Sequence, residues 1–163
     1  MKVNHAGEHG AVSIYTGQIL IAKFTNKRLA DELALFKAHE QIHRAIFAGE
    51  LERRGLSRCR SYWLCAAGGF SLGILTGLLG QQAIAATTVA VERVVLRHLG
   101  EQLDTLGDAD ARASAAISAI LAEEQEHHDG SFARIRPENI FTRMLGALVS
   151  SATESVIWIG MRV

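Results

Sequence analysis

A set of three residue positions occurs twice along this chain with identical spacing. A glutamate is followed 32 residues later by a second glutamate, and a histidine stands three residues beyond it. The whole arrangement recurs at an offset of 84 residues. The first triplet is Glu8, Glu40 and His43, and the second triplet is Glu92, Glu124 and His127. One Glu-x-x-His is common in helices, but two in register, each preceded by a glutamate at equal distance, constrain the fold strongly.

The triplet residues fall on apolar stripes with helical periodicity. Around Glu40 the stripe follows three- and four-residue steps and is otherwise apolar apart from His43. Its members are Leu29, Leu33, Phe36, Glu40, His43, Phe47 and Leu51. The segments around Glu8, Glu92 and Glu124 show the same pattern. Because a buried ionised carboxylate is costly unless it is paired or coordinated, four that converge in a core predict a neutralising partner.

The remaining pattern predicts an all-α fold. With one proline and no strand-like alternation, the periodicity is helical nearly throughout. We expect six helices, at about 3–24, 27–54, 61–80, 82–106, 109–135 and from 137 onward. Gly55 and Gly107 should end helices, Asp108 should cap the fifth, and Pro137 with Glu138 should open the sixth. The length of 163 residues fits a single domain spanning 1–163.

Two of these helices are expected to differ from the other four. Residues 61–91 contain no Asp, Glu, Lys or Arg and are long enough to cross a bilayer, which takes about 20 apolar residues. Five glycines, followed by Gln81 and Gln82, interrupt the stretch, which favours a buried or interface-lying helix over a spanning one. The last helix is amphipathic and could close the bundle or lie on a membrane. We therefore expect four bundle helices and two additional helices for membrane association.

The two triplets predict a metal centre. One glutamate from each of two helices, with Glu-x-x-His from each of two others, is the ligand pattern of a di-iron four-helix bundle. Two divalent irons would supply four positive charges against four glutamates, and neutral imidazoles would complete the coordination. Zinc prefers four ligands with more nitrogen or sulfur, and calcium and magnesium do not need paired imidazoles. Iron, or manganese, fits best, so we expect two Fe ions held by both triplets.

Composition and the other polar residues add less. Seventeen basic and seventeen acidic residues give no net charge, so nucleic acid is not expected as a partner. The two cysteines are six residues apart, and we expect both to be reduced. The chain opens without the pattern of a signal or transit peptide. His39 and His128 should lie beside the metal ligands or at the surface, and Tyr15 should pack. His98 could orient a substrate or simply fill the core.

Four segments carry a resemblance to a known family. NHAGEHGAVSIYTGQ, HEQIH, TTVAVE and EEQEHHD, in this order and spacing, resemble the demethoxyubiquinone hydroxylase family of ubiquinone biosynthesis over essentially the whole chain. The resemblance implies a ferritin-like fold and a di-iron monooxygenase that hydroxylates the ring of a polyprenylated methoxybenzoquinol with O2. The metal ligands of the family fall on the same six residues. Leu99 stands where animal relatives have tyrosine, and His9 stands where many relatives have tyrosine.

The resemblance also implies where and with what the protein works. The expected partners are O2, the polyprenylated quinol, the membrane surface, a lipid-binding protein of the same pathway and a second copy of the chain. The expected location is peripheral, on the cytoplasmic face of a bacterial inner membrane or the matrix face of a mitochondrial one. Two alternatives stay open: a ferritin-like protein that oxidises or handles iron, and a helical membrane-associated module whose triplets form buried salt bridges.

Overall fold

The computed structural model describes residues 1–136 and 139–162. Within these residues there are six helices and no strand, so the predicted all-α fold is confirmed. The helices are α1 (Lys2–Thr25), α2 (Lys27–Arg53), α3 (Tyr62–Leu79), α4 (Gln81–Leu106), α5 (Ala111–Phe132) and α6 (Ile140–Gly160). The architecture agrees with the ferritin-like helical bundle that the resemblance implies.

The chain divides into two compact units. Unit one comprises residues 1–84 with 155–163, and unit two comprises residues 85–154. The boundaries fall inside α4 and α6, so neither unit is a simple stretch of sequence. The expectation that 1–163 acts as a single domain stays a prediction.

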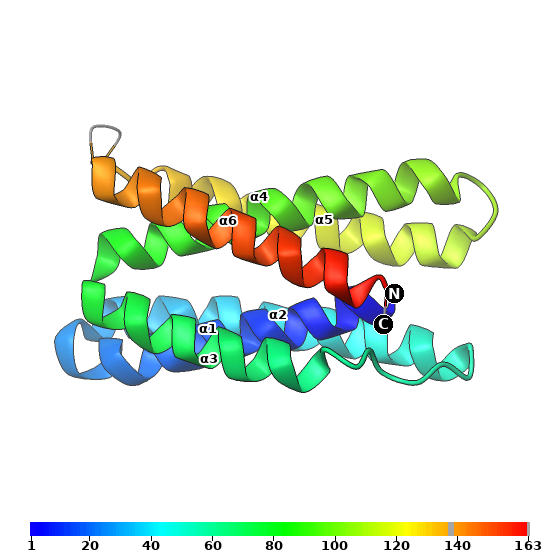
Figure 1. Ribbon diagram of the computed structural model, residues 1–163, viewed down its shortest axis with the longest axis horizontal. Helices are drawn as coiled ribbons and strands as arrows, with labels where there is room; N and C mark the ends of the chain where they lie inside the picture. The colour runs from blue at the N-terminus through cyan, green and yellow to red at the C-terminus, as the bar shows by residue number, and fades with distance from the viewer. Residues whose placement is uncertain (137–138, 163) are drawn as a thin grey trace. The chain divides into compact units, whose positions relative to one another are not determined.

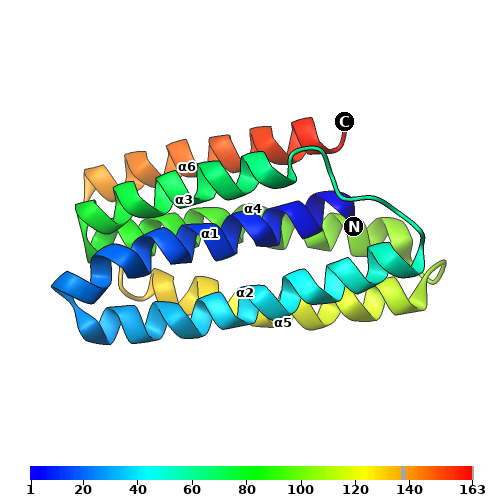
Figure 2. The ribbon, with the colours of Figure 1, turned by 90° about the horizontal axis from the view of Figure 1, so that it is seen from below.

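Within unit one, α1 and α3 lie side by side at very short range (Figures 1 and 2). Glycines face the neighbouring backbone on both helices. A Cβ atom on Gly73 would overlap the carbonyl oxygen of Ile14, and one on Gly17 would lie 2.6 Å from the carbonyl oxygen of Phe70. Gly69 likewise packs against the backbone of Gly10. The predicted glycine interruptions therefore allow two helix backbones to touch, as small residues do in closely packed helix pairs.

The other side of α3 is apolar and exposed. Its exposed large side chains are Trp63, Leu64, Phe70, Leu75, Leu78 and Leu79. Among the described residues α3 is the helix whose length and composition would suffice to cross a membrane, and one third of it is buried. A single helix of this kind is weak evidence for membrane association, because core helices pass the same test. Gly80, with a φ of 88°, ends α3 before α4 begins.

The packing of α1 on α2 forms a hydrophobic core in unit one. Tyr15 lies in this cluster with Leu33 and Ile84, and its ring meets Phe36 edge-on at 5.8 Å. Asn26 connects the two helices and caps α2, since its side chain accepts a hydrogen bond from the backbone of Leu29 at 3.1 Å. The predicted packing role of Tyr15 agrees with this position.

The end of α2 combines a glycine stop with a buried charge. Gly55 has a φ of +62°, and its backbone N–H donates to the carbonyl oxygen of Glu52. The backbone N–H of Leu56 donates to the carbonyl oxygen of Leu51, which completes a Schellman motif. The predicted stop at Gly55 is confirmed.

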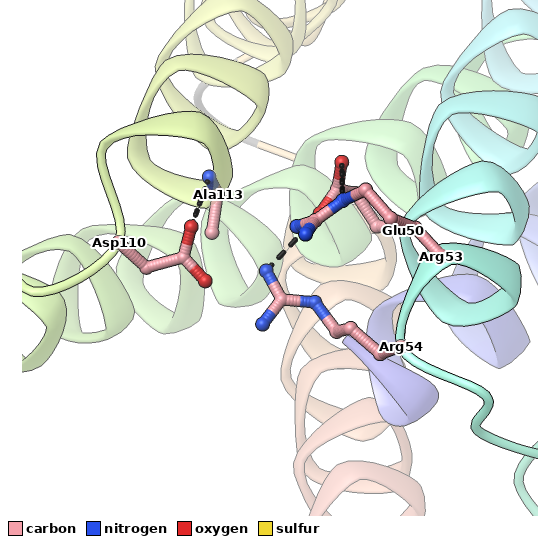
Figure 3. Close-up of polar contacts among 5 residues, drawn as sticks. All are labelled: Glu50, Arg53, Arg54, Asp110 and Ala113. Carbon is pink, nitrogen blue, oxygen red and sulfur yellow. Dashed lines mark hydrogen bonds and ion pairs between the residues drawn. The ribbon is translucent and has the colours of Figure 1, made fainter.

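One turn before this stop, Glu50 is buried beside two arginines (Figure 3). Arg53 donates to its carboxylate at 2.6 Å, and Arg54 donates at 3.1 Å. A buried carboxylate needs such compensation. Glu50 was not among the sequence-predicted residues, although basic residues three and four positions later indicate an ion pair on one helix face.

The cap of α5 differs from the sequence expectation. Gly107, with a φ of +47°, ends α4 as predicted. The N-cap of α5 is Asp110 rather than Asp108, and its carboxylate accepts from the backbone of Ala113 at 3.0 Å (Figure 3). The reason is that the turn after Gly107 continues through Ala109, whose N–H still donates to Leu106, so the helix begins later.

This cap makes a testable difference between two neighbouring aspartates. We expect Asp110→Ala to lower the free energy of unfolding by about 1 kcal/mol, because a helix N–H loses its acceptor. The matched control is Asp108→Ala, at an exposed position outside the helix, which should change stability little. Urea unfolding followed by circular dichroism measures both. Equal losses for the two variants would contradict the assigned cap.

Helix α6 is only partly buried. Asn139 precedes it and accepts from the backbone of Phe141 at 3.0 Å, while the predicted opening at Pro137 and Glu138 lies outside the described residues. In unit two, Ser150 donates to the carbonyl oxygen of Ala90 on α4. Val149 is buried, whereas several large apolar side chains are exposed: Ile140, Phe141, Met144 and Leu148. The helix thus packs along one side and leaves an apolar side exposed.

Candidate metal centre

The first triplet comes together in unit one. Helix α1 supplies Glu8, and α2 supplies Glu40 and His43 one turn apart. Each of the three offers one ligand atom, and these atoms lie within 4.8 Å of one another. Nδ1 of His43 is 3.7 Å from Oε2 of Glu40. Residues 32 positions apart thus meet because two long helices pack with their polar positions at the same level.

The second triplet repeats this arrangement in unit two. Helix α4 supplies Glu92, and α5 supplies Glu124 and His127. Their ligand atoms also lie within 4.8 Å of one another. Nδ1 of His127 is 3.5 Å from Oε2 of Glu124. The internal repeat in the sequence is therefore a repeat of local geometry.

All six triplet residues are at most 5% exposed. The apolar members of the stripes are buried with them, including Phe47 on α2 and Ile117 on α5. This burial excludes the alternative that the triplet residues lie on solvent-exposed helix faces, where a lone glutamate is usually found. Each triplet offers two carboxylates and one imidazole inside an apolar wall. This mixed oxygen and nitrogen donor set suits iron or manganese, whereas structural zinc would favour four ligands richer in nitrogen or sulfur.

The remaining sequence-predicted residues lie around these helices. His39 and His128 are half-buried, and His128 pairs with the exposed Asp129 at 2.9 Å. His98 is half-buried on α4, and burial lowers its pKa. These positions leave the roles of the three histidines as predictions. Both cysteines are free, as expected.

A ring cluster near Glu8 was missed by sequence reasoning. Tyr62 of α3 stacks on His9 with ring centroids 4.1 Å apart and on His5 at 4.9 Å. Arg44 donates to Nδ1 of His9 at 2.8 Å, because a guanidinium has no acceptor. Burial first, and then the charges of Arg44 and Arg58, lower the pKa of His5. The only sequence signal was the four-residue spacing of the two histidines on one helix face.

The comparisons with known proteins agree with the motifs. The family described as "Ubiquinone biosynthesis protein COQ7" matches residues 1–160. A "3-demethoxyubiquinol 3-hydroxylase" of Rhodospirillum rubrum is 35% identical over all of this chain and 76% of its own length. A "NADPH-dependent 3-demethoxyubiquinone 3-hydroxylase, mitochondrial" of Dictyostelium discoideum is 31% identical with the same coverage. A Xanthomonas campestris 3-demethoxyubiquinol 3-hydroxylase is 33% identical over 97% of this chain and 72% of its own length.

Proposed function

This chain belongs to the family of the ubiquinone biosynthesis protein COQ7, and on that premise we propose that it is a di-iron monooxygenase acting on a demethoxyubiquinol. It inserts one oxygen atom of O2 into the quinol ring as a hydroxyl group, while two electrons from a reductant and two protons convert the other atom to water. The observation that carries the proposal is the pair of buried triplets, one in each unit, with the same donor set and local geometry. Relatives named as hydroxylases of this quinol support the substrate.

The proposed ligands are the six triplet residues, three from each unit. Four carboxylates balance the charge of two divalent ions, and two neutral histidines complete the coordination. This neutrality would allow the buried glutamates of both triplets to stay ionised.

The protein's own contribution is placement and exclusion of water. The iron pair supplies the activation of O2, which side chains alone cannot perform. Glutamates can bind a metal through one or both oxygens, and the histidines hold fixed positions one helical turn after a glutamate. The buried rings and aliphatic chains beside the triplets, such as Phe47 and Ile120, keep water away from the reacting atoms.

The exposed apolar sides of α3 and α6 suit a membrane surface. A polyprenyl tail is insoluble in water, so its ring must reach the centre from a lipid environment. In this proposal the protein is peripheral, bound to the cytoplasmic face of a bacterial inner membrane or the matrix face of a mitochondrial one. A lipid-binding protein of the same pathway and a second copy of the chain are further proposed partners.

Labelled oxygen gas tests the proposed reaction. The protein is loaded with Fe(II) without oxygen, mixed with a short-chain demethoxyquinol and exposed to ¹⁸O₂, and the quinone product is weighed by mass spectrometry. We expect a ring hydroxyl that carries the label. Oxidation of the iron with unmodified quinol would instead support the alternative of an iron-oxidising protein. The uncharged, exposed side of α3 speaks against that alternative, because a soluble iron-storage shell needs a hydrophilic exterior.

A further inference from the structure

Within unit one, ring side chains form a continuous series from the surface to the helix turn that carries Glu8. Trp63 is 69% exposed, and its ring centroid lies 5.2 Å from that of Tyr62. Tyr62 in turn stacks on His5 at 4.9 Å. His5 precedes Glu8 by three residues on α1, a spacing that brings Cβ atoms to about 5–6 Å. The two steps between ring centroids are thus 5.2 Å and 4.9 Å.

We propose, on the basis of the proposed function, that Trp63, Tyr62 and His5 form a protective electron path to the metal centre. The path operates when the reduced iron pair has reacted with O2 and no quinol is bound. The Trp63 indole loses one electron, and its N–H proton goes to the surrounding water. The electron tunnels through the rings of Tyr62 and His5 to the oxidised centre. Two ferrous ions supply two electrons to O2, and two electrons that pass along the path, with four protons from water and the indole, complete its reduction to two water molecules. A small thiol then returns one electron and one proton to the indole, after which a second electron can follow; the two thiols oxidised in two such steps join as a disulfide.

The positive charges around these rings determine which ring is left oxidised. The guanidinium of Arg58 lies 5.1 Å from the centroid of the Tyr62 ring, and Arg44 is bonded to the neighbouring His9. These two positive charges disfavour a further positive charge on the buried Tyr62 ring. The exposed indole of Trp63 is in contact with water, which solvates the positive charge of the oxidised ring and accepts its N–H proton. The oxidised site is therefore Trp63, away from the reacting centre.

The second tryptophan provides an internal comparison. Trp158 is 55% exposed, so a diffusing oxidant reaches it about as easily as Trp63. Its ring is covered by the guanidinium of Arg162, 3.7 Å from the ring centroid, and lies on α6. It does not belong to the ring series that leads to Glu8.

The experiment maps oxidation in protein loaded with Fe(II) and then exposed to O2 without quinol or thiol. Peptide mass spectrometry should find oxygen added to Trp63 and little added to Trp158, and added demethoxyquinol should suppress the modification. Tyr62→Leu, which removes the bridging ring, should lower the modification of Trp63 to the level of Trp158. Tyr62→Phe, which keeps the ring, should preserve it and serves as the control for folding.

Freeze-quench electron paramagnetic resonance gives a second measurement that does not depend on Tyr62 variants. We expect an indole radical in the wild-type protein and its loss in Trp63→Phe, whose quinol hydroxylation should be unchanged. Equal modification of Trp63 in the wild type and in Tyr62→Leu would overturn the path, since it would indicate a diffusing oxidant. Hydroxylated quinol with neither an indole radical nor modified Trp63 would overturn the path alone. If the iron-loaded protein consumes no O2, both the path and the proposed function are wrong.

Discussion

Replacing Glu92 with alanine is expected to abolish both iron loading and quinol hydroxylation. Glu92 is a buried carboxylate of the second triplet, on a different helix from Glu124 and His127. Its loss leaves three carboxylates against the four charges of two divalent ions and opens a cavity where a ligand stood. Iron bound after anaerobic loading and gel filtration should fall from about two ions per chain to well below one. The labelled hydroxyl should no longer be formed.

A matched control lies on the same helix. Glu101 of α4 is exposed and makes a long contact with Arg97, 3.9 Å between charged atoms. Glu101→Ala removes the same charge from the same helix and should leave iron content and turnover near wild type, since exposed ion pairs contribute little. If Glu92→Ala hydroxylates normally, the proposed ligand set is wrong. If both variants lose iron equally, the effect is general destabilisation of α4.

The largest expected effect on folding comes from a single methyl group on α3. In Gly73→Ala the new Cβ overlaps the backbone oxygen of Ile14 and lies 2.9 Å from the carbonyl carbon of that residue. Neither helix backbone can shift to make room unless α1 and α3 separate. The reason is that Gly17 and Gly69 also pack directly against the backbone of the other helix. We expect the free energy of unfolding to fall by about 3 kcal/mol or more. Denaturant unfolding in mild detergent, followed by circular dichroism, measures it.

Gly68→Ala is the control for this prediction. It stands on the same helix, and a Cβ there meets nothing within 4 Å. Alanine is the better helix former by about 1 kcal/mol, so this variant should be as stable as the wild type or more so. The two variants add the same atom in adjacent turns of α3. A stable Gly73→Ala protein would show that the two helices do not pack at the range described.

Some features of this protein follow from local sequence patterns, and others depend on contacts between distant parts of the chain. The helices were predictable because apolar side chains three and four positions apart share a face in any α-helix, whatever it packs against. The first four predicted spans agree with the structure to within one residue at both ends, and the stops at Gly55 and Gly107 are confirmed. The burial of both triplets was predictable for the same reason, since each lies on an otherwise apolar stripe.

Other features depend on neighbours that are distant in sequence. The cap of α5 was misplaced because Asp108 and Asp110 are equally good caps locally, and only the length of the preceding turn separates them. The pairing of glycines between α1 and α3, and the stack of Tyr62 on two histidines, join residues more than fifty positions apart.

The helical class, the family and the six candidate ligands could be predicted from the sequence, because local periodicity and exact spacing carry that information. The packing of the helices was needed to show that the ligand atoms of each triplet lie within 4.8 Å of one another, and that α3 buries Gly69, Gly73 and Gly77. It was also needed to show that Trp63 connects through rings to the turn of Glu8. The physical reason is that side-chain contacts between helices depend on their packing distance and rotation. No single helix encodes either quantity.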